Sequence, residues 1–144
     1  MRPFIERVRS GGTIIGDGAL GTMLMARGLP AGVAPETLNL ERPHVLEAIA
    51  REYVEAGSEI VSTNTFGASP LRLAQHGLDA FTNEINQAAV DAVRRAVDGR
   101  AYIAGDIGPS GRVLKPYGDC EPAEVSASAW ACRVRGSISS ASRR

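Results

Sequence analysis

The chain has 144 residues, of which 44% are hydrophobic and 22% charged, and its formal net charge is zero; these values are ordinary for a globular protein. The first 125 residues carry 12 basic and 16 acidic side chains, a net charge of −4, which gives no reason to expect nucleic acid or an anionic membrane as a partner. No apolar run approaches the ~20 residues of a membrane span, and the charged first ten residues lack the apolar segment of a signal peptide, so we expect a soluble, cytoplasmic protein.

The predicted elements begin with a buried strand over Thr13–Ile15, because this short β-branched stretch is followed by glycine. A helix is predicted to begin at Pro43, since proline favours the first helical turn, and to end at Gly57. A second strand is predicted over Glu59–Thr63. The helix between the two strands has one apolar face, formed by Val45, Leu46, Ile49, Tyr53 and Val54.

The same alternation continues along the chain. A short helix is predicted around Leu71–Ala74 and stops at Gly77, and a long apolar stripe predicts a second main helix from about Phe81 to Val97, ended by Gly99. A third strand is predicted over Ala101–Ile107. This order of strands and helices is typical of an α/β protein with a parallel sheet. The loops that follow the strands, GDGALGT, NTFGAS and GPSG, are therefore expected to face one side and to form the ligand site.

The first loop, GDGALG at residues 16–21, has the glycine spacing of a dinucleotide-binding turn. Such a turn also needs a long helix directly after it and an acidic residue at the end of the next strand. Here TMLMAR allows at most two helical turns, and the second strand ends in Thr63 and Asn64, so a nucleotide site is only a minor alternative. The glycines suit a bound carboxylate as well as a phosphate, or they make a sharp turn and nothing more.

Five stretches together resemble the homocysteine S-methyltransferase domain, as found at the N-terminus of cobalamin-dependent methionine synthase. They are GDGALGT at 16–22, PETLNLERP at 35–43, EYVEAGSEIVST at 52–63, NTFGAS at 64–69 and GDIGPSG at 105–111. Their order and spacing carry the resemblance, which extends from about Gly12 to Val125. It implies a (β/α)₈ TIM barrel, of which this chain holds the N-terminal part, about three βα units.

The resemblance also implies a chemistry: methyl transfer to the homocysteine thiol, giving methionine. The family's methyl donor is methylcobalamin, S-methylmethionine or betaine. The sequences of the loops are closer to the cobalamin type, which implies a corrinoid module as partner. The implied substrate-binding residues are Asp17, Gly18, Ala19, Leu20, Gly21, Thr22, Asn64, Thr65, Phe66, Asp106, Gly108 and Pro109. Asp17 and Asn64 are the leading polar contacts, with bracing of the loops as their alternative role; Phe66 packs against substrate or covers the barrel rim. No residue is assigned as catalytic.

The family's Zn²⁺ holds the homocysteine sulfur as a thiolate. Its ligands in the family are a cysteine after a late strand and a Cys-Cys pair near the C-terminus, and this chain matches neither motif. Cys120 and Cys132 fit no zinc spacing, and we interpret them as ordinary thiols. Zinc is therefore implied by the family alone, and no metal ligand is assigned here.

The sequence changes character after Val125. Residues 126–144 hold six serines and four arginines but no acidic residue, a composition typical of disorder or of a frameshifted reading. We therefore divide the chain into a partial homocysteine-binding barrel domain, residues 1–125, and a tail outside the family, residues 126–144; a genuine short protein with a basic tail is the alternative. Such a fragment is expected to be inactive alone. The rival hypothesis is a noncatalytic half-barrel that binds an amino acid or pairs with a complementary chain.

Overall fold

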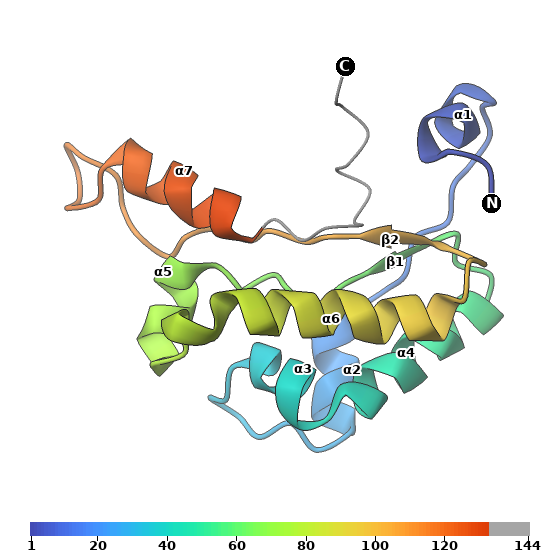
Figure 1. Ribbon diagram of the computed structural model, residues 1–144, viewed down its shortest axis with the longest axis horizontal. Coiled ribbons are helices and arrows are strands. Elements are labelled where there is room, and N and C mark those ends of the chain that lie inside the picture. Colours follow the sequence, from blue (N-terminus) through green and yellow to red (C-terminus); the bar gives the residue numbers. More distant parts are fainter. Residues whose placement is uncertain (133–144) are drawn as a thin grey trace.

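The computed structural model describes residues 1–132 (Figure 1). Its helices and strands are, in chain order, α1 (Phe4–Arg9), α2 (Leu20–Ala26), η1 (Pro35–Thr37), α3 (Leu38–Glu41), α4 (Pro43–Glu55), β1 (Ile60–Ser62), α5 (Pro70–Leu73), η2 (Ala74–His76), η3 (Asp79–Phe81), α6 (Thr82–Val97), β2 (Tyr102–Ala104) and α7 (Pro122–Ala131). Within the described residues the chain is thus an α/β structure with two strands.

The two strands pair in parallel, with Val61 opposite Ile103, and α2 to α6 lie on one side of them in Figure 1. Val61 is 1% exposed and packs with Ala50 of α4 and Val93 of α6. Burial of a side chain of this size contributes roughly 1.5–3 kcal/mol. A second apolar cluster joins α2, α3, α4 and α6 and consists of Leu24, Leu29, Leu38, Leu46, Ile49 and Ala92. The packed helical layer therefore supports the strands from one face.

The two main helices agree with the predictions from apolar spacing. The helix predicted from Pro43 spans Pro43–Glu55, and the helix predicted from about Phe81 spans Thr82–Val97. After α6, Asp98 and Gly99 both adopt left-handed backbone conformations, with φ of 44° and 72°. The helix ends here because two such residues in succession cannot continue a right-handed helix.

The prediction of a buried strand over Thr13–Ile15 was wrong. In the structure this segment reaches β1 through a single parallel bridge between Gly16 and Ile60. The Ile15 carbonyl accepts a hydrogen bond from the Glu59 N–H at 2.8 Å, and the Asp17 N–H donates to the Ile60 carbonyl at 2.9 Å. Pairing stops there, so the segment forms too few ladder hydrogen bonds for a strand, and Ile15 stays 54% exposed. The other two predicted strands are shorter than expected, at three residues each.

Helix α7 crosses the domain boundary that we placed at Val125. It continues to Ala131, and the buried Ser128 accepts a hydrogen bond through its Oγ from the Leu71 N–H at 3.3 Å. Residues 126–131 of the predicted tail thus belong to a helix that contacts α5, and the boundary at Val125 stays a prediction. The rest of the predicted tail, residues 133–144, lies outside the described residues.

Helices long and apolar enough to cross a membrane are absent from the part of the chain that the structure describes.

Candidate functional site

The three glycine-bearing loops line one cleft of about 590 Å³, as the order of elements predicts. We call residues 16–22 the first loop, 64–69 the second loop and 105–111 the third loop. The first contributes Gly18, Leu20 and Gly21, the second contributes Asn64, Phe66 and Gly67, and the third contributes Asp106. Further walls come from residues 32–36, from the end of β1, and from Arg72 and His76.

Asp17 braces the first loop against β1. Its carboxylate accepts two hydrogen bonds from Ser62, one from the backbone N–H at 2.7 Å and one from the hydroxyl at 3.0 Å. An ionised carboxylate can accept about four hydrogen bonds, so hydrogen-bonding capacity remains, but Asp17 lines a small cavity beneath this loop and not the three-loop cleft. The bracing role foreseen as an alternative for Asp17 is thus present in the structure.

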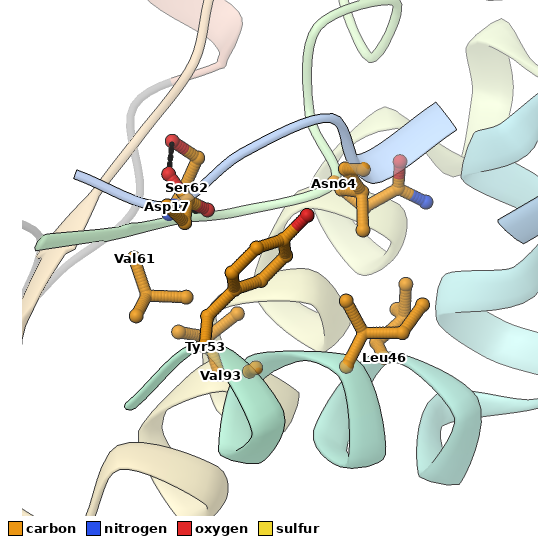
Figure 2. Close-up of a pocket in the computed structure, with 10 residues that line it drawn as sticks. Asp17, Leu46, Tyr53, Val61, Ser62, Asn64 and Val93 are labelled. Carbon is orange, nitrogen blue, oxygen red and sulfur yellow. Dashed lines mark hydrogen bonds between the residues drawn. The ribbon is translucent and has the colours of Figure 1, made fainter. Parts of the chain in front are cut away.

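A small cavity lies directly beneath the first loop (Figure 2). Its volume, about 10 Å³, is close to the minimum for one water molecule. Tyr53 rises from α4 with its hydroxyl directed toward the first loop and Asn64 (Figure 2). A Cβ placed on Gly18 would lie 3.0 Å from the Tyr53 hydroxyl oxygen. A side chain at Gly18 would therefore require the Tyr53 hydroxyl to move by a few tenths of an ångström, independently of any ligand.

The rest of the first loop leads into α2. Leu20 begins this helix and packs on the cluster around Leu24, while Thr22 turns back and donates its hydroxyl hydrogen to the Ala19 carbonyl at 3.1 Å. Ala19 and Thr22 are exposed and do not line the cleft. With seven residues, α2 is shorter than the helix that supports a pyrophosphate in dinucleotide folds, as the sequence suggested.

Asn64 is held by the segment before α4. Its Nδ2 donates to the Pro35 carbonyl and to Asn39 Oδ1, both at 2.8 Å, and Asn39 Nδ2 donates back to the Asn64 carbonyl at 2.9 Å. Asn39 is 1% exposed and Asn64 6% exposed. Because buried amides need such partners, this reciprocal pair fixes the start of the second loop.

The second and third loops are joined by three hydrogen bonds. The Thr65 hydroxyl donates to the Asp106 carbonyl at 2.7 Å and accepts from the Asp106 N–H at 3.1 Å, and the Gly108 N–H donates to the Phe66 carbonyl at 2.9 Å. A Cβ on Gly108 would lie 2.5 Å from that carbonyl oxygen, so glycine is needed there. The Phe66 ring is 56% exposed at the cleft, whereas Pro109, also exposed, does not line it.

Sequence reasoning missed four residues that shape this site: Glu36, Asn39, Tyr53 and Ser62. Each lies in one of the stretches that carry the family resemblance, but a polar residue next to an apolar face gives no local sign of its partner. Asn39 offered the best signal, because a buried helical position occupied by an amide calls for a specific hydrogen-bond partner.

The residues described here do not supply a metal site. Within residues 1–132 no group of three or more His, Cys, Asp or Glu side chains could hold a metal ion. Cys120 is 1% exposed, and burial raises the pKa of its thiol. Burial likewise raises the pKa of Cys132, whose Sγ lies within hydrogen-bonding distance of the Ala68 and Ser128 carbonyls. With no cluster of three donors around either thiol, the donor set of residues 1–132 does not fit the zinc implied by the resemblance.

Comparison with known proteins gives a consistent set of matches. The family model described as homocysteine S-methyltransferase matches residues 14–137, a range that passes Val125. The methionine synthase of Mycobacterium tuberculosis is 36% identical over 126 residues, covering 78% of this chain and 10% of that protein. Betaine–homocysteine S-methyltransferase 1 of Danio rerio is 36% identical over 110 residues, covering 74% of this chain and 28% of that protein.

Two solved structures of the homocysteine methyltransferase MmuM from Escherichia coli share the fold. The oxidized form aligns with a TM-score of 0.67 at 24% identity, over 77% of this chain and 42% of that chain. The metallated form aligns with a TM-score of 0.65 at 26% identity, over 74% and 42%. The chain thus matches part of a TIM-barrel methyltransferase and spans less than half the length of each of these relatives.

Proposed function

Because the chain belongs to the homocysteine S-methyltransferase family, we propose that its three-loop cleft binds homocysteine and that the chain contributes about three βα units of a (β/α)₈ barrel. The observation that carries the proposal is the convergence of the first, second and third loops on one cleft. In parallel α/β folds the loops after the strands form the ligand site, and these are the loops that carry the family's sequence motifs.

The cleft has groups suited to both ends of the amino acid. Asp17 borders the cleft next to Gly18 instead of lining it; it is braced by Ser62 and has lone pairs left to accept hydrogen bonds from an ammonium group. Exposed N–H groups of the first loop, near Gly18 and Gly21, suit the carboxylate. The exposed ring of Phe66 and the side chain of Leu20 offer apolar contact to the thioether-forming side chain. The other proposed residues (Ala19, Thr22, Asn64, Thr65, Asp106, Gly108 and Pro109) shape and hold the loops.

Thiol activation is not assigned to the residues described here. The proposed Zn²⁺ would supply a thiolate at neutral pH, but the donor groups of residues 1–132 do not fit that ion. We therefore ascribe no chemical step to them beyond binding and orienting homocysteine. Methylcobalamin, delivered by a corrinoid module, is the methyl donor that we propose for the whole protein. The 144-residue chain alone is expected to transfer no methyl group.

A noncatalytic half-barrel is the second candidate function. The observation in its favour is that, among the residues the structure describes, β2 pairs on one edge only, with β1, so its other edge is open to a further strand. In this case the cleft binds an amino acid, or the sheet pairs with a complementary chain. Translating the source DNA beyond codon 120 in three frames distinguishes the cases: a frame that encodes further strands and a Cys-Cys loop supports the enzyme, and its absence supports the half-barrel.

Calorimetric titration with two ligands tests the site. We expect Asp17→Asn to weaken binding of L-homocysteine about tenfold, since a hydrogen bond between charged groups is worth roughly 1.5–3 kcal/mol. The same change should leave binding of 4-mercaptobutyrate, which lacks the amine, unaltered. Asp79→Asn, on an exposed residue of η3, is the matched control. Equal weakening of both ligands would mean that Asp17 only braces the loop; no binding of homocysteine by the unaltered chain would overturn the proposal.

A further inference from the structure

Glu36 is a buried carboxylate at the edge of the cleft that the proposed function leaves without a role. It lies in η1 and is 5% exposed. Its Oε1 accepts a hydrogen bond from the Gly67 N–H at 2.7 Å. No ion pair compensates it among residues 1–132. Since a buried charge is costly unless hydrogen bonds stabilise it, this contact with the second loop is the main local compensation for its burial.

The contact is one half of a clamp on the second loop. On one side, Glu36 holds the Gly67 N–H and the Pro35 carbonyl accepts from Asn64 Nδ2. On the other side, the Gly108 N–H holds the Phe66 carbonyl. The peptide between Phe66 and Gly67 is therefore bonded at its oxygen to the third loop and at its nitrogen to Glu36. A hydrogen bond to a carboxylate is about twice as strong as one between neutral groups, so the Glu36 side is the stronger half.

The fit around Gly67 is close as well. A Cβ on that residue would lie 2.7 Å from Glu36 Oε1, shorter than ordinary van der Waals contact. Glycine at this position thus allows the carboxylate to approach the backbone directly.

We propose that Glu36 is a positioning residue of the cleft. Its carboxylate fixes the Phe66–Gly67 peptide and thereby the Phe66 ring against which the homocysteine side chain packs. The inference rests on the proposed function for its ligand, but the hold on the loop is a property of the chain itself. Displacements of the order of 1 Å in such supporting groups weaken ligand positioning strongly.

The test compares Glu36→Ala and Glu36→Gln in the ¹⁵N-labelled 144-residue chain, with Glu41→Ala as matched control. Glu41 belongs to the same sequence stretch and is exposed. We expect Glu36→Ala to accelerate hydrogen exchange at the Gly67 amide about tenfold or more and to weaken L-homocysteine binding about tenfold. Glu36→Gln should retain most of the exchange protection at Gly67 and most of the affinity for L-homocysteine, because its amide oxygen can accept the same hydrogen bond. Glu41→Ala should change neither.

Each outcome is decisive. Unchanged Gly67 exchange in Glu36→Ala would overturn the hold on the loop, and faster exchange with unchanged homocysteine affinity would overturn its role in the cleft. If Glu36→Ala does not fold, Glu36→Gln decides: its Gly67 amide proton should move upfield as the acceptor loses its charge, and an unmoved resonance contradicts the proposal. If the unaltered chain binds no homocysteine, the proposed function fails and the role in the cleft fails with it, while the exchange rates still decide the hold on the loop.

Discussion

Asp17 and Ser62, which are 45 residues apart in the sequence, are joined by two hydrogen bonds to one carboxylate. The pair connects the first loop to the end of β1 and lies above the small cavity into which Tyr53 points (Figure 2). The residue that we propose to contact the ligand amine is therefore also the residue that sets the position of its own loop.

Alanine substitutions of Ser62 and Asp17 distinguish how much each of the two hydrogen bonds contributes to stability. Ser62→Ala removes only the hydroxyl bond and is expected to lower the free energy of unfolding by about 1 kcal/mol, whereas Asp17→Ala also leaves the Ser62 N–H without its acceptor and is expected to cost about 2–3 kcal/mol. Urea denaturation followed by circular dichroism measures both. Ser10→Ala, on an exposed serine with only a local hydrogen bond, is the control. Equal costs for the two changes would contradict this account.

A side chain at Gly18 is expected to press against the Tyr53 hydroxyl. Gly18→Ala should destabilise the chain by about 1–3 kcal/mol, because its Cβ would lie 3.0 Å from the Tyr53 hydroxyl oxygen. Tyr53→Phe removes that oxygen, so the same substitution should cost less in the Tyr53→Phe background. Gly21→Ala is the matched control, since a Cβ there meets no atom within 4 Å. A double-mutant cycle gives the coupling, and additive effects would show that the contact is not the cause.

The Asn39–Asn64 pair should behave as one unit. Asn39→Ala removes two donated hydrogen bonds and leaves the Asn64 amide short of an acceptor, so we expect a loss of about 2–3 kcal/mol. The double change with Asn64→Ala should cost clearly less than the sum of the single changes. Asn83→Ala, on the exposed face of α6, should leave the unfolding midpoint nearly unchanged. A large decrease of the unfolding midpoint in Asn83→Ala would mean that replacing any asparagine of this region by alanine lowers stability, whether or not it belongs to the pair.

Acid should weaken the attachment of α1. Arg7 binds Glu59 through two hydrogen bonds, of 2.7 and 2.9 Å, and this hydrogen bonding lowers the pKa of Glu59 in the folded chain. Because the pKa of Glu59 is lower in the folded chain than in the unfolded chain, the Arg7–Glu59 pair stabilises the folded state above the unfolded pKa of about 4.3. This contribution is lost as the pH falls through the folded pKa of Glu59. Glu59→Gln should therefore flatten the decline of the urea midpoint below about pH 4.3.

Glu55→Gln provides the control for that titration. Glu55 is exposed at the end of α4 and forms no ion pair among the described residues. Its acid profile should match that of the unaltered chain. Parallel decline in Glu59→Gln and the unaltered chain would mean that other carboxyl groups dominate the acid response.

The sequence by itself determined the elements whose burial follows a local period. The apolar faces of α4 and α6 were predictable within about two residues, because the side chains that a helix buries recur every three to four positions. The α/β order of elements also predicted that the three loops lie on one side, because parallel strands connected by helices all run in one direction. The family motifs at those loops then indicated homocysteine as ligand.

Tertiary structure decided everything that depends on partners far along the chain. Thr13–Ile15 looks like a strand locally, but this segment reaches β1 through one bridge only, at Gly16. Helix α7 extends past Val125, where Ser128 Oγ accepts a hydrogen bond from the Leu71 N–H of α5. The partners of Asp17, Asn39 and Glu36 lie 45, 25 and 31 residues away. A hydrogen bond needs two groups within about 3 Å, and only the folded path of the chain brings such residues together.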